Sequence, residues 1–229
     1  MENIWIASFD IGKKNFSFYI EKINTPQLKT IKNINKKIRY NADGTCTNDF
    51  TNILTDIYKN GEKVLLENVD LTYNCDKKAY LDPETMFNMY DTLDSFSKYW
   101  DKCSIFLIEK QMSFGKNNNT MAIKLGQHCW SYFCFKYGRF KTIIEYPAYN
   151  KTQVLGAQKK QYKYNGKLKY KSISKPERKK WCINKAIEIL NLRNDIETIS
   201  VIDSCKKKDD LCDVICQLQS FKYLNFVDV

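Results

Sequence analysis

The stretch WIASFDIG, residues 5–12, is an apolar run that ends in an acid and a glycine. A run of this length before a turn signal is typical of a buried strand. The stretch FSFYIE, residues 16–21, has the same character, and the short polar segment between the two runs suits a hairpin turn. The apolar runs 104–109 and 140–147 predict two further strands of the same sheet.

Helical patterns lie between and after these runs. Asp82 followed by Pro83 predicts the start of one helix, because an aspartate cap and a proline in the first turn favour that position. The lysine-rich segment 24–51 is expected to hold an edge strand and a variable loop, and residues 63–68 fit either a short strand or a loop. Helices are predicted at about 50–58, 82–100, 120–137, 176–192 and 208–223.

This order predicts an α/β fold. We expect a mixed sheet that begins with an antiparallel hairpin, continues with parallel strands and has helices on both faces. The 229 residues suit a single domain. A variable insertion around 24–80 and a basic loop at 158–180 would be its two additions.

Composition narrows the class of protein. The net charge of +11 and the pI of about 9.1 favour a polyanionic partner, most often nucleic acid. An apolar run of about 18 residues, which a membrane helix needs, is missing from the sequence. The first residues lack the pattern of a secretory signal. Nine scattered cysteines with no Cys-x-x-Cys pair, and a single histidine, predict reduced thiols in an intracellular compartment and no zinc site.

Carboxylates end two predicted strands and open the last helix. Asp10 and Glu109 end strands, and Asp210 and Asp213 lie three residues apart on one face of a helix start. Singly, each has a structural explanation: a turn for Asp10, an ion pair for Glu109, and a helix cap for Asp209 or Asp210. Together they favour a site for hard divalent ions, which prefer oxygen ligands and can cut phosphodiesters in pairs.

At these acids the sequence resembles the RuvC-type Holliday-junction resolvases, particularly the branch found in poxviruses and other large DNA viruses. The resemblance spans roughly residues 4–221, is poor from 24 to 80, and implies an RNase H-like fold. The matching pieces, in the order of the family, are FDIG at 9–12 with Asn15, LIEKQ at 107–111, Tyr146-Pro147 with Lys151 and then RKK at 178–180, and KDDLCD at 208–213.

The resemblance implies a crossover junction endodeoxyribonuclease of DNA recombination and repair, which resolves four-way junctions by paired symmetric nicks. It implies that Asp10, Glu109, Asp210 and Asp213 are catalytic and bind two Mg²⁺ ions, for which Mn²⁺ can substitute. Asp209 lies beside this motif, so the first helical ligand is open between Asp209 and Asp210, although the Asp-x-x-Asp spacing favours Asp210.

The resemblance also implies a homodimer, with the helix at 120–137 at the subunit contact. Two-fold symmetry suits a substrate with two equivalent strands to cut. If the chain is viral, it would act in the cytoplasm or nucleus of an infected cell.

A basic segment runs from residue 158 to 180, and within it only Glu177 opposes the cations. Its lysines are expected to contact the DNA backbone, and its tyrosines could stack on unpaired bases, with a solvated loop as the alternative. Lys207 and Lys208 are further candidates because they precede the helical acids. The expected DNA-binding set in the segment is Lys159, Lys160, Lys163, Lys167, Lys169, Lys171, Lys175, Arg178, Lys179, Lys180, Tyr162 and Tyr164, with Tyr170 interleaved.

Two other functions remain open from the sequence. Another RNase H-like nuclease, acting on RNA–DNA hybrids or in transposition, would share the metal centre and differ in substrate. A module that binds branched DNA without cutting it is the second alternative, and the complete set of acids argues against it.

Overall fold

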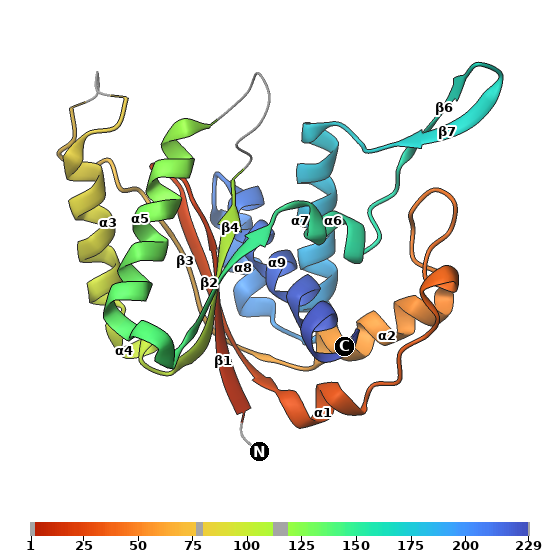
Figure 1. Ribbon diagram of the computed structural model, residues 1–229, viewed down its shortest axis with the longest axis horizontal. Coiled ribbons are helices and arrows are strands. Elements are labelled where there is room, and N and C mark those ends of the chain that lie inside the picture. Colours follow the sequence, from red (N-terminus) through yellow and green to blue (C-terminus); the bar gives the residue numbers. More distant parts are fainter. Residues whose placement is uncertain (1–2, 77–79, 112–118, 229) are drawn as a thin grey trace. The chain divides into compact units, whose positions relative to one another are not determined.

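The computed structural model describes residues 3–76, 80–111 and 119–228 (Figure 1). The chain divides into two compact units. One, here called the helical unit, comprises Met1–Glu2, Asn24–Gly61 and Tyr149–Val229. The other, the sheet unit, comprises Asn3–Ile23 and Glu62–Ala148. The expectation of a single domain stays a prediction.

The sheet unit is built on a five-stranded mixed sheet in the order β3-β2-β1-β4-β5. β1 pairs in parallel with β4, β4 pairs in parallel with β5, and β2 pairs antiparallel with β3. The predicted mixed sheet is therefore confirmed. Its strands are β1 (Asn3–Asp10), β2 (Phe16–Asn24), β3 (Glu62–Val69), β4 (Cys103–Lys110) and β5 (Thr142–Pro147).

Three helices of the sheet unit accompany these strands: α3 (Pro83–Ser95), α4 (Ser97–Trp100) and α5 (Thr120–Tyr137), followed by the short 3-10 helix η2 (Gly138–Phe140). As predicted, Asp82 caps α3, with its side chain accepting a hydrogen bond from the backbone of Glu84. α5 packs against β4 and α3.

Alternate strand residues pack with these helices into an aromatic core. Phe9 of β1 lies with its ring centroid 5.5 Å from that of Trp100 and 5.3 Å from that of Phe133 on α5. The indole of Trp100 donates a hydrogen bond of 2.7 Å to the carbonyl of Leu93. Each fully buried side chain of this kind contributes about 1.5–3 kcal/mol. This packing fixes the register of β1 and β4, and with it the positions of the residues at the carboxyl ends of both strands.

The helical unit is organised around its last helix, α9 (Lys208–Phe226), which packs against α1, α2, α6, α7 and α8. This surrounding explains why α9 is buried on nearly every side from Leu211 to Tyr223. The other elements are α1 (Thr25–Thr30), the 3-10 helix η1 (Lys36–Ile38), α2 (Asn48–Lys59), α6 (Tyr149–Val154), β6 (Lys160–Tyr164), β7 (Lys167–Lys171), α7 (Lys175–Leu192) and α8 (Ile196–Ser204).

Polar side chains hold the two ends of the helical unit together. The guanidinium of Arg39 donates hydrogen bonds of 3.0 and 2.7 Å to the carboxylate of Asp228, a bidentate pair. The buried ammonium of Lys222 donates to the carbonyl of Asn60 and, at 2.8 Å, to the side chain of Gln219. These contacts prevent α9 from sliding along its axis, and so they also set the position of the acids in its first turns.

Two expectations from the sequence were wrong. Segment 24–51 contains no third strand of the sheet, because Asn24 caps a helix with proline in its first turn; the edge strand is β3, at residues 62–69. The basic segment 158–180 is not a loop, since it forms the hairpin β6–β7 and the start of α7. Among the residues that the structure describes, no helix has the length and apolar character needed to span a membrane.

Candidate metal centre

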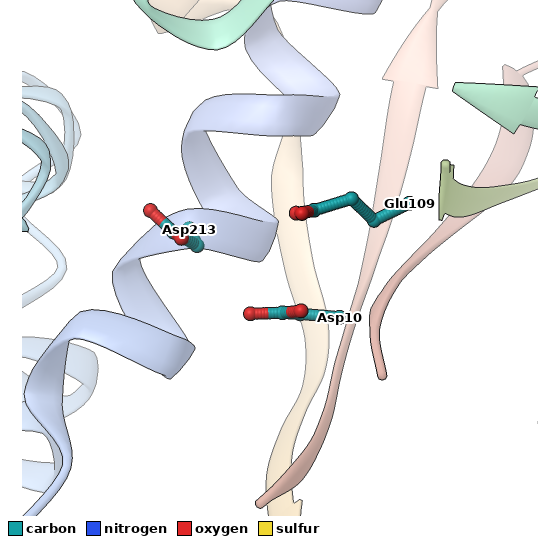
Figure 2. Close-up of side chains that lie close together, drawn as sticks. All are labelled: Asp10, Glu109 and Asp213. Carbon is teal, nitrogen blue, oxygen red and sulfur yellow. The ribbon is translucent and has the colours of Figure 1, made fainter. Parts of the chain in front are cut away.

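Asp10 and Glu109 lie at the carboxyl ends of neighbouring parallel strands. The register pairs Phe9 of β1 with Ile108 of β4, so the next position along each strand brings the two acids side by side. Phe9 and Ile108 are buried in the aromatic core, and because side chains alternate along a strand, the acids point to the opposite face. Figure 2 shows both carboxylates pointing the same way.

The distance between these two acids is short enough for a shared cation. A carboxylate oxygen of Asp10 and one of Glu109 lie within 4.8 Å of each other, and both residues are half-buried. Two like charges this close disfavour each other unless a cation or a proton comes between them. Oxygen ligands of this kind suit Mg²⁺ or Ca²⁺, which bind at about 2.0–2.6 Å. The donor set therefore fits a hard divalent ion.

The first turns of α9 carry the other acids. Asp213 forms an ion pair of 3.1 Å with Lys151 of α6, whose side chain is only 7% exposed. Asp209 forms an ion pair with Lys179 of α7. Burial acts to raise the pKa of Asp209, but the hydrogen bond and charge of Lys179 outweigh it and hold this pKa below its usual value. Burial, and then the charge of Asp209, raise the pKa of Asp210 to about 6.

The acids of α9, which the sequence could not distinguish, differ in these contacts. Asp209 pairs with Lys179 and Asp213 with Lys151, and the choice of Asp210 over Asp209 as the first helical ligand stays a prediction. Lys151 was quoted from the sequence without a role, although it is a buried partner of Asp213. The signal was a lysine that follows the end of a strand in a segment with no other charge.

The structure shows the surroundings of several of the expected DNA-binding residues. Some have carboxylate partners: Lys179 pairs with Asp209, and the ammonium groups of Lys160 and Lys208 lie 2.6 and 2.7 Å from acidic oxygens. The residues of the β6–β7 hairpin are exposed to solvent throughout, including Lys163, Lys167, Lys169, Lys171, Tyr162 and Tyr164.

Comparisons with known proteins give the chain's relatives and its fold. No family model matches the chain. The uncharacterized protein 170L of Invertebrate iridescent virus 6 is 37% identical over 250 residues, which cover 97% of this chain and 90% of that protein. The crystal structure of Fowlpox virus resolvase with substrate Holliday junction DNA has a TM-score of 0.51 and 16% identity, over 96% of this chain and 98% of that one. RuvC of Thermus thermophilus has a TM-score of 0.50 and 12% identity, over 96% and 95%. The fold is thus the RNase H-like fold of RuvC-type resolvases.

Proposed function

The chain belongs to the same family as protein 170L of Invertebrate iridescent virus 6, and we propose that it is a metal-dependent endonuclease that resolves four-way DNA junctions by paired symmetric nicks. The observation that carries the proposal is the pair Asp10 and Glu109, held within 4.8 Å by strand register. The fold on which they lie is shared with a resolvase whose crystal structure includes Holliday junction DNA.

The metal centre is proposed to include acids of both units. Asp10 and Glu109 each offer a carboxylate oxygen to a common ion (Figure 2), and Asp213 and Asp210 of α9 are proposed as the further ligands, as the resemblance to the resolvases implies. Two Mg²⁺ ions bound there would supply an activated water and stabilise the leaving 3′ oxygen, as in other two-metal nucleases. The chain's own residues hold these ligands in place: strand pairing orients the sheet acids, and Lys151 orients Asp213.

The partner is proposed to be branched DNA, bound by a homodimer. The net charge of +11 suits a polyanion. α5 is the proposed dimer element, and two aromatic rings at its carboxyl end are almost wholly in water: Phe135 in its last turn is 96% exposed and Phe140 of η2 is 98% exposed. Apolar groups that are exposed to this degree favour burial against a second surface. The relative's viral origin supports action in an infected cell.

Purified protein should be incubated with Mg²⁺ and three labelled substrates of matched sequence: a four-way junction, an RNA–DNA hybrid and a plain duplex. The expected result is nicking of the junction alone, at symmetric positions on opposite strands, with 5′-phosphate and 3′-hydroxyl ends. Cutting of the hybrid in preference to the junction would assign another RNase H-like activity. Junction binding without nicking at any divalent ion concentration would leave a binding module.

A further inference from the structure

The hairpin β6–β7 is a regular, exposed element of the helical unit (Figure 1). Its two strands pair antiparallel from Lys160 with Lys171 to Tyr164 with Lys167. The connection is the two residues Asn165 and Gly166, with φ of 48° and 71°. Positive φ at both central residues is the pattern of a type I′ turn, which matches the twist of the strands it joins. The hairpin therefore has a defined register and two defined faces.

One face concentrates cations and aromatic rings. Directly paired residues share a face, and successive pairs alternate between faces. The register then divides the residues of the hairpin into two sets. The set called here the aromatic-basic face is Lys160, Tyr162, Tyr164, Lys167, Lys169 and Lys171, and the opposite face is Gln161, Lys163, Leu168 and Tyr170. The first face has no acid, and lysine or tyrosine occupies every position on it.

Side chains on the aromatic-basic face already contact one another. The ammonium of Lys169 lies 4.3 Å from the ring centroid of Tyr164, and that of Lys171 lies 5.5 Å from the centroid of Tyr162. Each such cation–π contact contributes about 0.5–1 kcal/mol at an exposed site. Tyr164 remains 54% and Tyr162 37% exposed. Flat apolar rings and positive charges are thus presented together to solvent.

The base of the hairpin is fixed to its own unit. The carboxylate of Glu177 on α7 forms an ion pair of 2.6 Å with the ammonium of Lys160. The backbone N–H of Lys159 donates a hydrogen bond of 2.6 Å to the carbonyl of Asp43. Lys160, Gln161 and Tyr170 line a hollow at the base of the hairpin that is shared with Asp43 and Glu177. The base of the hairpin is therefore anchored, whereas the outer part of the aromatic-basic face is exposed to solvent.

We propose that the aromatic-basic face binds unpaired nucleotides at the branch of the DNA substrate, an inference that rests on the proposed function. Lys167, Lys169 and Lys171 contact phosphates, and Tyr162 and Tyr164 stack on bases. A nucleotide offers both groups at once, a flat ring and a nearby negative charge, and stacking on tyrosine requires a base that is not already stacked in a duplex. Lys163, also expected from the sequence to contact DNA, lies on the opposite face and is outside the proposed binding face.

The test measures binding by fluorescence anisotropy, in the absence of divalent ions, to a four-way junction, a single strand and a duplex. Tyr162→Leu with Tyr164→Leu should weaken single-strand and junction binding at least about five-fold, because stacking on aromatic side chains contributes that much per base. Duplex binding should change less than about two-fold, because its bases remain stacked. Lys169→Ala should weaken all three and lower the slope of log K against log salt by about 0.7–0.9, the loss expected for one phosphate contact.

Lys163→Ala is the matched control, because it removes the same charge from the same hairpin on the opposite face. It should leave both affinity and salt slope close to wild type. Equal effects of Lys163→Ala and Lys169→Ala, with unchanged melting temperatures, would overturn the proposed face. Tyrosine variants that bind the single strand as tightly as wild type would overturn the stacking.

Failure of this inference is distinguishable from failure of the proposed function. If the wild-type protein nicks junctions but the hairpin variants bind DNA normally, only the proposed role of the hairpin in DNA binding is refuted. If the wild-type protein never nicks DNA but its single-strand binding depends on the aromatic-basic face, only the proposed nuclease activity is refuted.

Discussion

The acids of the sheet unit and those of the helical unit are held in opposite ways. Asp10 and Glu109 come within 4.8 Å of each other, like charge beside like charge. In the helical unit, lysines lie against the acids instead: Lys179 against Asp209, Lys151 against Asp213 and Lys160 against Glu177. Backbone pairing sets the first arrangement, and side-chain attraction sets the second.

This difference separates acids that strand register brings together from acids that pair with a lysine. A divalent cation between two neighbouring carboxylates relieves their repulsion, whereas the charge of an acid beside a lysine is offset in part by that lysine. Asp213 combines both features, since it has a buried lysine partner and is also a proposed metal ligand. The comparison therefore predicts a graded series of effects.

The largest effect is expected at the sheet acids. Asp10→Asn or Glu109→Gln should lower the cleavage rate by on the order of a thousand-fold or more, as for other groups that touch the reacting atoms. Junction binding should persist in both variants. Their melting temperatures should stay close to wild type, because each change keeps the size and shape of the side chain. Single-turnover cleavage, anisotropy and thermal melts measure the three quantities.

Glu145→Gln is the control for this prediction. Glu145 lies on β5 opposite Ile108, so it points to the face of the sheet that packs against α5, where it accepts a hydrogen bond of 2.9 Å from Gln127. Cleavage should be near wild type in this variant. Comparable losses of cleavage in Glu145→Gln and Glu109→Gln would contradict the prediction. They would show that cleavage depends on acids of the sheet in general and not on the pair at the strand ends.

The next effect is expected at Asp213 and Lys151. Asp213→Asn should lower cleavage strongly, though less than the changes at the sheet acids, and Lys151→Met should lower it about 10- to 100-fold, the usual cost of losing a group that orients a ligand. Lys151→Met should also lower stability, because it leaves a half-buried carboxylate without its partner. The double variant should recover part of that stability, giving a coupling energy of about 0.5–3 kcal/mol in a double-mutant cycle. Additive changes in stability would show that the ion pair contributes nothing to the fold.

Strand-end chemistry was predictable from the sequence because it depends on local pattern and register. A buried run that ends in an acid, repeated at Asp10 and Glu109, needs only parallel pairing to become a site, and the runs themselves predict the strands. The edge strand was harder. Residues 62–69 are short and half-buried, so their pattern did not distinguish a strand from a loop.

Lysine partners could not be predicted, because they depend on how helices far apart in sequence pack. Lys151 and Asp213 are 62 positions apart, and nothing in either segment indicates the other. The hairpin β6–β7 was missed for a different reason. Its strands alternate lysine with tyrosine and other polar residues, and the apolar face that normally marks a strand is absent. Asn165-Gly166 was the available signal, since this pair favours a two-residue turn.

A smaller effect is expected at Asp209 than at its neighbour. Asp209→Asn should change cleavage only a few-fold and cost at most about 1 kcal/mol of stability, since Lys179 is partly exposed and pairs of this kind contribute little. Asp210→Asn should reduce cleavage far more, because Asp210 is a proposed ligand. Parallel rate measurements on the two variants decide the register. A greater loss with Asp209→Asn would move the ligand role to Asp209 and break the distinction between neutralised and ion-binding acids.

The smallest effect is expected at Glu177, at the base of the hairpin. Hydrogen bonds from Lys160, and then from Ser174, lower the pKa of Glu177 from 4.5 to about 2. A depressed folded pKa means that the stabilisation is complete above pH 4.5 and is lost as pH falls toward 2. Glu177→Gln keeps a side chain that can serve the capping box at Ser174, so it removes chiefly the charge. The difference in melting temperature from wild type should be constant from neutral pH down to 4.5 and shrink below it. A difference that persists unchanged at pH 3 would show that shape, not charge, holds this acid, and Glu177 would then leave the set of acids neutralised by lysine.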